Sequence, residues 1–254
     1  MDSQEKKKLI TYDDLILVTG SNGFIGSKVV ELLAEKGFRK VRCLVRYSSN
    51  ISKLNEVIEK YNKTNFDVFT GNLLNREDCE NLVKDVKVIY HVAAGIGGSF
   101  SSSYLNCVVT TRNLIEAALK TGHLARFVNV GSFASYTNFR MKRGSLLDEN
   151  CETVSEYRET YNPYAFAKTE QDNIVIQYGK NEGLPYVIMR PGTVYGPGAR
   201  EKLTARVGNK TFGILLHIGG SNHLPLTYID NCAESIILGG LVEGVDGEVF
   251  NIVD

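Results

Sequence analysis

The sequence lacks an excess of charge, a long apolar run and an apolar leader. Its 29 lysine and arginine residues balance 29 aspartate and glutamate residues, so the formal net charge is zero. A general nucleic-acid binder carries a basic excess, and this balance therefore disfavours that class. No run of about 18 apolar residues is present, which argues against a membrane-spanning helix. The first ten residues, MDSQEKKKLI, lack the apolar stretch of a signal peptide.

Cysteine and histidine patterns typical of metal sites are also lacking. The cysteines are odd in number, scattered along the chain and never part of a CxxC pair. This spacing suits reduced thiols in the cytosol better than a disulfide framework or a zinc site, so we expect a cytoplasmic protein without a bound metal. We interpret the cysteines as small hydrophobes of the core, namely Cys43, Cys79, Cys107, Cys151 and Cys232. The histidines are interpreted as a strand end, His91, and as loop or surface residues, His123, His217 and His223.

What the sequence does contain is a regular alternation of strand-like and helix-like segments. Short apolar runs predict strands at residues 15–19, 41–45, 66–70, 86–91, 126–130 and 185–190. Between them, apolar residues at helical spacing or polar segments predict helices at 26–36, 52–63, 75–83, 104–121 and 164–181. Alternation of this kind predicts an α/β fold with a doubly wound, Rossmann-like parallel sheet. We expect residues 1–190 to form this domain and the glycine-rich residues 191–254 to form part of a smaller lobe interleaved with it.

A glycine-rich turn follows the first predicted strand. Gly20 permits a tight turn, Gly23 lets the backbone approach a pyrophosphate, and Gly26 allows close packing of helix and strand. The N-terminus of the helix that follows favours an anion. A glycine triplet can also be a plain loop, but the strand–turn–helix context favours a phosphate-binding turn.

The GxxGxxG spacing resembles the nucleotide-binding turn of the extended short-chain dehydrogenases/reductases, a family of epimerases, dehydratases and reductases. Further segments resemble landmarks of that family, namely Asn72-Leu73, the HVAA segment 91–94, the RPGTVYGPG segment 190–198, LTYIDN at 226–231 and GEVFNI at 247–252. The resemblance implies a nicotinamide dinucleotide held by Gly20, Asn22, Gly23, Phe24, Ile25, Gly26, Arg46, Asn72, Leu73, Ala93, Ala94, Tyr164, Lys168, Pro191 and Thr193. It also implies a nucleotide-sugar substrate and a homodimer through helices 104–121 and 164–181.

A YxxxK pair, Tyr164 and Lys168, lies at the start of the predicted helix 164–181. A spacing of four places both side chains on one helix face. Among 13 tyrosines one such pair is expected by chance, so its position after the fifth strand carries the argument. The resemblance implies that Tyr164 is the general acid or base, that the Lys168 ammonium lowers the phenol's pKa and that Lys168 holds the cofactor ribose. It also implies that Ser132 polarises the reacting oxygen.

The end of the second strand bears on the choice of cofactor. An acid there would bind the ribose 2′-hydroxyl of NAD, but Arg46 occupies the expected position. A guanidinium grips a 2′-phosphate well, so we predict a preference for NADP. The alternative is a solvated Arg46 leaning over the adenine in an NAD enzyme.

Two positions depart from the family pattern. Phe133 and Ala134 follow Ser132, where the family's dehydratases carry an Asp-Glu pair, which argues against 4,6-dehydration. Cys107 stands where the family often has Asn, with Asn106 one residue away, and neither receives a role. Because the family usually continues beyond the strand-like end of this chain, we expect a fragment, a truncated form or an omitted tail.

The combined pattern predicts an NAD(P)-dependent enzyme that transfers a hydride at a secondary alcohol or ketone. A dehydrogenase or reductase would consume cofactor, whereas an epimerase would return it unchanged, and the sequence leaves both open. The alternative from another class is a non-catalytic dinucleotide sensor on the same fold. Such proteins often lose the tyrosine or the lysine, and here both Tyr164 and Lys168 are present.

Overall fold

A seven-stranded parallel sheet forms the centre of the molecule. The computed structural model describes residues 9–95, 98–137, 141–142, 144–199, 208–211, 214–217 and 224–254. The strand order is β11-β6-β5-β4-β1-β2-β3, and every pairing in this sheet is parallel. Its strands are β1 (Leu15–Thr19), β2 (Lys40–Val45), β3 (Asn65–Thr70), β4 (Val86–His91), β5 (Arg126–Val130), β6 (Tyr186–Pro191) and β11 (Val249–Ile252). The predicted Rossmann-like fold class is confirmed.

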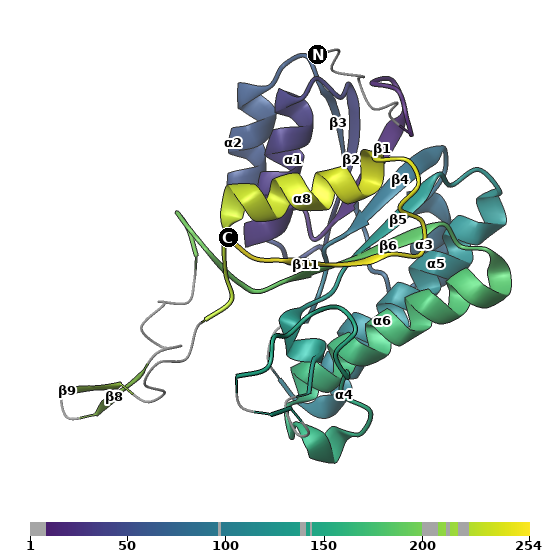
Figure 1. Ribbon diagram of the computed structural model, residues 1–254. Helices are drawn as coiled ribbons and strands as arrows, with labels where there is room; N and C mark the ends of the chain where they lie inside the picture. The colour runs from purple at the N-terminus through teal and green to yellow at the C-terminus, as the bar shows by residue number, and fades with distance from the viewer. Residues whose placement is uncertain are drawn as a thin grey trace, which may run out of the picture.

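Helices cover both faces of the sheet (Figure 1). One face carries α1 (Phe24–Glu35), α2 (Ser52–Lys60) and α8 (Ile229–Leu241), and the other carries α3 (Arg76–Leu82), α5 (Thr110–Thr121) and α6 (Pro163–Glu182). Neighbouring residues of β1 serve opposite faces, since Ile16 and Val18 belong to one apolar cluster and Leu17 to the other. Burial on both faces explains why the strand sequences are apolar runs rather than alternating patterns.

The element boundaries differ from the predicted ones mostly by one to three residues. The largest difference concerns the predicted helix 104–121, which is divided into α4 (Phe100–Tyr104), a π-helical segment Leu105–Val109, and α5. Smaller elements complete the described chain: β7 (Thr193–Tyr195) pairs with β10 (Leu226–Tyr228), and β8 (Gly208–Thr211) pairs with β9 (Ile214–His217). Short 3-10 turns lie at Phe133–Ser135 and Tyr157–Glu159. His223 lies outside the described residues, as does the side chain of His217.

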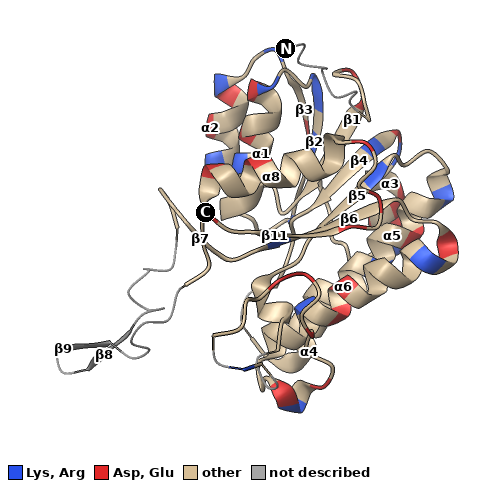
Figure 2. Ribbon diagram, viewed as in Figure 1, with Lys and Arg blue, Asp and Glu red and all other residues tan. Residues whose placement is uncertain are grey.

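Charged residues of both signs alternate along the outer helices (Figure 2). Several form ion pairs across elements, such as Lys36 of α1 with Glu234 of α8 at 2.7 Å and Lys120 of α5 with Glu80 of α3 at 2.6 Å. These side chains are partly or largely exposed, so each pair contributes little to stability.

The parallel sheet determines where the predicted site residues lie. In a parallel sheet all strands end at the same edge, and ligands bind in the crevice outside that edge. The glycine turn follows β1, Ala93 follows β4, Ser132 follows β5, and Pro191 is the last residue of β6. Four segments that are far apart in the sequence therefore meet at one edge.

Candidate functional site

The glycine-rich turn after β1 is tightly packed and leaves a helix end open. Gly20 has a φ of +65°, a conformation that favours glycine, and a Cβ there would lie 2.9 Å from the Ala93 backbone. A Cβ at Gly26 would lie 2.1 Å from the Gly20 carbonyl oxygen. Gly23 is the N-cap of α1, and no side chain caps that helix. The turn therefore presents backbone N–H groups to an anion.

Two neighbouring strands hold the turn in place. The Ser21 hydroxyl donates to the Leu44 carbonyl of β2 at 2.9 Å, and the Asn22 amide donates to the Asn50 carbonyl at 3.2 Å. On the other side, the Ala93 N–H donates to the Thr19 hydroxyl at 3.2 Å. The strand ends of β2 and β4 thus fix the position of the glycine turn.

The residues predicted to contact the adenine side of a dinucleotide follow two adjacent strands. Val45 of β2 pairs with Thr70 of β3, so the segments that carry Arg46 and Asn72 leave the sheet from adjacent strands. Arg46 is exposed and forms a turn in which its N–H donates to the Ser49 hydroxyl at 3.1 Å. The Asn72 side-chain oxygen accepts from the Leu74 N–H at 3.0 Å, so part of its acceptor capacity is used within its own turn. Leu73 beside it is buried.

The predicted catalytic pair lies in the first turns of α6. The Asn162 side chain caps this helix and accepts from the Tyr164 N–H at 3.0 Å, with Pro163 at the first helical position. Tyr164 is half-buried, whereas Lys168 is only 2% exposed. The Lys168 ammonium donates to the Val130 carbonyl at 2.6 Å and therefore lies against the last residue of β5.

Ser132 lies two residues beyond that carbonyl. Its hydroxyl oxygen accepts from the Ala134 N–H at 3.1 Å and opens the 3-10 turn Phe133–Ser135. Helix α6 packs on this turn, since the Thr169 hydroxyl donates to the Ser135 carbonyl at 3.2 Å. The structure thus places Ser132 and Lys168 together at the end of β5, with Tyr164 one turn before Lys168 on the same helix.

Sequence comparison assigns the chain to a family. A sequence profile of the NAD dependent epimerase/dehydratase family matches residues 16–252. The chain belongs to this family. This confirms the resemblance to the extended short-chain dehydrogenases/reductases.

Similar proteins include enzymes of nucleotide-sugar metabolism. A dTDP-D-glucose 4,6-dehydratase of Dictyostelium discoideum is 28% identical in an alignment that covers 94% of this chain but only 59% of the relative. The low-salt glycan biosynthesis protein Agl12 of Haloferax volcanii is 30% identical, with coverage of 93% and 76%. A structure of UDP-glucuronic acid 4-epimerase from Bacillus cereus, in complex with UDP-glucuronic acid and NAD, is 25% identical. Its TM-score is 0.73, with coverage of 94% of this chain and 77% of that one.

The sequence analysis gave no site role to four buried polar residues, Thr19, His91, Thr111 and Gln171, which link the end of β1 to Lys168. The Thr19 hydroxyl contacts His91 Nδ1 at 2.8 Å, and His91 Nε2 contacts the Thr111 hydroxyl at 2.8 Å. Gln171 Nε2 donates to the same Thr111 hydroxyl at 2.9 Å, and Gln171 Oε1 accepts from Lys168 at 2.8 Å. The only local signal in the sequence is that polar Thr111 and Gln171 occupy the buried faces of their helices.

Burial sets the protonation states beneath the site. Burial, with a smaller contribution from the Lys168 charge, lowers the pKa of His91 to about 3, so this imidazole is neutral. Burial also raises the pKa of Asp172, although Arg190 and Lys168 oppose the shift. Asp172 accepts from Arg190 Nε at 2.9 Å and from the Asn129 amide at 2.7 Å. The carboxylate is therefore engaged in holding α6 to β5 and β6.

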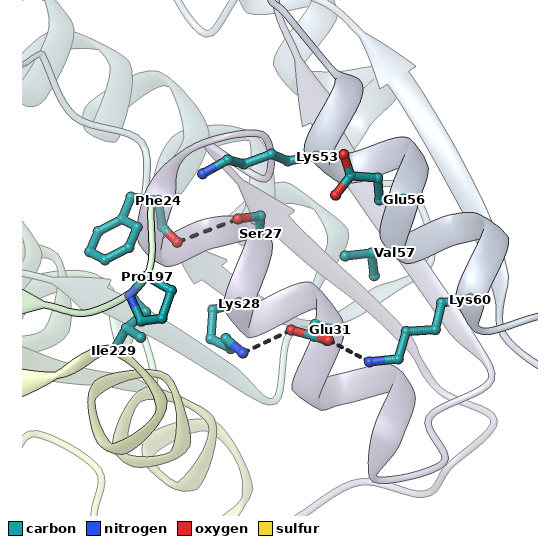
Figure 3. Close-up of a pocket in the computed structure, with 10 residues that line it drawn as sticks. All are labelled: Phe24, Ser27, Lys28, Glu31, Lys53, Glu56, Val57, Lys60, Pro197 and Ile229. Atoms are coloured by element: carbon teal, nitrogen blue, oxygen red, sulfur yellow. Dashed lines mark hydrogen bonds and ion pairs between the residues drawn. The ribbon is translucent and has the colours of Figure 1, made fainter. Parts of the chain in front are cut away.

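One cavity of the described residues lies beside the glycine turn rather than over Tyr164. It has a volume of about 280 Å³ and is lined by Phe24, Ser27, Lys28, Glu31, Lys53, Glu56, Val57, Lys60, Pro197 and Ile229 (Figure 3). Glu31 accepts from Lys28 at 2.9 Å and from Lys60 at 2.8 Å. Phe24 is the single predicted cofactor-binding residue in this lining. Glu31 thus pairs with two of the three lysines that line the cavity.

Two features of the described residues bear on other classes of site. Across these residues, no group of three or more His, Cys, Asp or Glu side chains is arranged to hold a metal ion. Nor does this part of the chain contain a helix of the length and apolar character needed to cross a membrane.

Proposed function

We propose that this chain carries the catalytic core of an NAD(P)-dependent oxidoreductase or epimerase that acts at a secondary alcohol or ketone of a nucleotide sugar. The observation that carries the proposal is the Lys168 ammonium, held against Val130 one helical turn after Tyr164, at the sheet edge where the glycine turn lies. The Bacillus cereus relative, which binds UDP-glucuronic acid and NAD, supports the substrate class.

The turn between β1 and α1 fits a dinucleotide. At Gly26 a side chain would collide with the Gly20 carbonyl, and the uncapped start of α1 supplies N–H donors for a pyrophosphate. Arg46 and Asn72 would hold the adenosine half, while Ala93, Tyr164 and Lys168 would hold the other half. When bound, the nicotinamide supplies the hydride chemistry.

The chain's own residues supply the proton chemistry. A free phenol titrates near pH 10, too high to accept a proton readily at neutral pH. The Lys168 ammonium favours the phenolate of Tyr164, which then takes the proton from a substrate hydroxyl or returns it to a ketone oxygen. The Ser132 oxygen accepts from the Ala134 N–H, which leaves its own O–H for the reacting substrate oxygen.

We propose oxidation–reduction or epimerisation rather than dehydration, although several similar proteins are dehydratases. Loss of water needs an acid and a base next to the sugar. In this chain Phe133 and Ala134 occupy the turn that follows Ser132, and neither side chain can exchange a proton. The expected product of UDP- or dTDP-hexoses is therefore an epimer or a ketosugar that retains its 6-hydroxyl.

Substitution of Tyr164 by Phe tests the proposal. UDP-glucose, UDP-glucuronic acid and dTDP-glucose are incubated with NAD or NADP, and products are read by NMR alongside absorbance at 340 nm. Tyr164→Phe should lower kcat by roughly a hundredfold to ten-thousandfold, because it removes the proton acceptor. The dissociation constant for NAD, measured by calorimetry, should rise far less than kcat falls, because the glycine turn, Arg46 and Lys168 are unchanged. Unchanged turnover in the variant contradicts the catalytic assignment, and dinucleotide binding without turnover of any sugar supports the sensor alternative.

We also propose a preference for NADP through Arg46 and a homodimer through α5 and α6. We further propose that residues 191–254 supply part of a substrate lobe, interleaved with α8 and β11 of the main domain. The lobe is supported by the β7–β10 pair, which forms a small sheet of its own beside the end of β11. The dimer rests on the family resemblance, and sedimentation equilibrium of the chain tests it directly. Residence in the cytoplasm stays a prediction from the pattern of the five cysteines.

A further inference from the structure

Gln171 is a buried amide that joins two helices beneath the site. It is fully buried and lies three residues after Lys168 on α6. Its Oε1 accepts from the Lys168 ammonium at 2.8 Å, and its Nε2 donates to the Thr111 hydroxyl of α5 at 2.9 Å. A buried amide whose two ends both have partners is fixed in orientation by its surroundings.

The hydrogen-bond donors and acceptors of this network are consistent only in one direction. The Thr111 O–H donates to the Cys107 carbonyl, so the Thr111 oxygen accepts from both Gln171 and His91. His91 therefore carries its proton on Nε2, and its Nδ1 accepts from the Thr19 O–H. A flipped Gln171 would turn its NH₂ group toward the ammonium and its oxygen toward a hydroxyl whose proton is already used.

We propose that Gln171, held by Thr111 and His91, is a positioning residue that fixes the Lys168 ammonium for its action on Tyr164. An ammonium has three N–H groups, and here the Val130 carbonyl and Gln171 Oε1 accept two of them. The third N–H is thereby left for a group in the site. A lysine side chain has many rotamers, and confining it to one of them costs conformational entropy. Two fixed acceptors offset this cost and favour a single position of the ammonium. This inference rests on the proposed role of Lys168.

The charged and titratable groups near Lys168 do not replace this contact. Asp172 interacts with Lys168 through its charge, but its oxygens accept from Arg190 and Asn129. His91 is neutral and lies on the far side of Thr111. Gln171 is thus the side chain whose oxygen accepts directly from the ammonium within the described part of the chain.

The pKa of Tyr164 in the cofactor-free protein gives the test. The full chain is labelled with ζ-¹³C tyrosine, and the Tyr164 signal is assigned by its loss in Tyr164→Phe. Gln171→Leu should move the titration of the Tyr164 signal to higher pH than in wild type, because a less well-placed ammonium favours the phenolate less. Thr111→Val, which leaves the amide without its anchor, should shift it in the same direction. The double variant should shift it no further than Gln171→Leu alone, since both changes break one network.

Two further variants separate the possible outcomes. Tyr178→Phe removes another α6–α5 hydrogen bond, the 2.9 Å contact of the Tyr178 hydroxyl with Glu116, and should leave the Tyr164 pKa unchanged. Lys168→Met should raise that pKa at least as much as Gln171→Leu does. If Lys168→Met has no effect, the proposed function of Lys168 fails. If Lys168→Met shifts the pKa but neither Gln171→Leu nor Thr111→Val does, the positioning role of Gln171 is wrong while the proposed function stands.

Discussion

Individual residues at the edge of the sheet differ greatly in how far the sequence alone could place them. Gly20 and Gly26 were predictable, because a tight turn after a buried strand has no room for side chains at these positions. The structure agrees, since a Cβ at Gly20 would collide with the Ala93 backbone and one at Gly26 with the Gly20 carbonyl. His91 was predicted to end a strand, and it does. Its contacts with Thr19 and Thr111 were not predictable, since they join residues 72 and 20 positions away. Local patterns carry no information about such pairings.

The neutral state of His91 predicts a pH dependence of stability. The pKa of His91 falls from an unfolded value of 6.5 to about 3 in the folded chain. Between these values only the unfolded state binds the proton, so lowering the pH favours unfolding. This residue should add a slope of up to about 1.4 kcal/mol per pH unit to the unfolding free energy. Urea unfolding of His91→Gln between pH 4 and 6.5 should show a slope smaller by that amount, with parallel curves above pH 7. Equal slopes throughout would refute the assignment.

The exposed Arg46 predicts the cofactor preference. A hydrogen bond to a charged group contributes about 1.5–3 kcal/mol, so Arg46→Ala should weaken NADP binding about tenfold or more. NAD lacks the 2′-phosphate, and its dissociation constant should change much less. Calorimetric titration of wild type and variant with both dinucleotides gives the four constants. If wild type binds NAD as tightly as NADP, Arg46 does not select the cofactor, and the alternative of a solvated arginine over the adenine is correct.

At the scale of helices and strands, a buried ion pair joins α6 to the sheet. Asp172 of α6 and Arg190 of β6 are 1% and 5% exposed, and their contact spans 2.9 Å. The sequence predicted both elements but not this pair, because a charged residue in a local pattern is normally assigned to the surface. The same reasoning missed Arg126, which is fully buried in β5 and donates to the Gly239 carbonyl of α8 at 2.9 Å. Both arginines are buried because a helix packs over them and supplies their partners, α6 for Arg190 and α8 for Arg126.

Replacing Asp172 by Asn should destabilise the protein strongly. The change leaves the buried Arg190 guanidinium without a counter-charge, which costs about 3–5 kcal/mol. The exposed pair of Asp13 with Arg39, at 2.9 Å and with Asp13 61% exposed, provides the matched control. Asp13→Asn should change the unfolding free energy by less than about 1 kcal/mol. Urea unfolding at pH 7 measures both, and equal losses would show that burial of the Asp172 pair has no energetic consequence.

Across the whole molecule, the succession of strands and helices along the chain was predictable. The division of the predicted helix 104–121 into α4, a π-helical segment and α5 was not. Short apolar runs predicted every strand of the main sheet except β11, whose sequence was described as strand-like but was not placed in the sheet. The sequence pattern did not mark the π-helical segment Leu105–Val109, which packs against α6 together with α4 and α5. The predicted catalytic and cofactor-binding roles remain to be tested, although the fold brings their residues to one edge.

Buried cysteines lie on both faces of the sheet, so their reaction with a thiol reagent measures how often each face opens. Cys43 and Cys232 belong to the cluster under α1 and α8, whereas Cys79 and Cys107 belong to the cluster under α3 and α5. Burial raises the pKa of Cys43, Cys79 and Cys232 to about 12, so these thiols are protonated as well as shielded. Cys151, unlike the other four, is partly exposed.

Native protein treated with iodoacetamide at pH 8 should therefore gain one adduct per chain, at Cys151, and five adducts in guanidinium chloride. Cys151→Ser should gain none under native conditions, which provides the control. The remaining four thiols should react only as the protein opens, and mass spectrometry gives a rate for each. Because both clusters pack on the same seven strands, Cys43 and Cys79 should share one slow rate. Rapid labelling of either thiol would show that its side of the sheet opens independently.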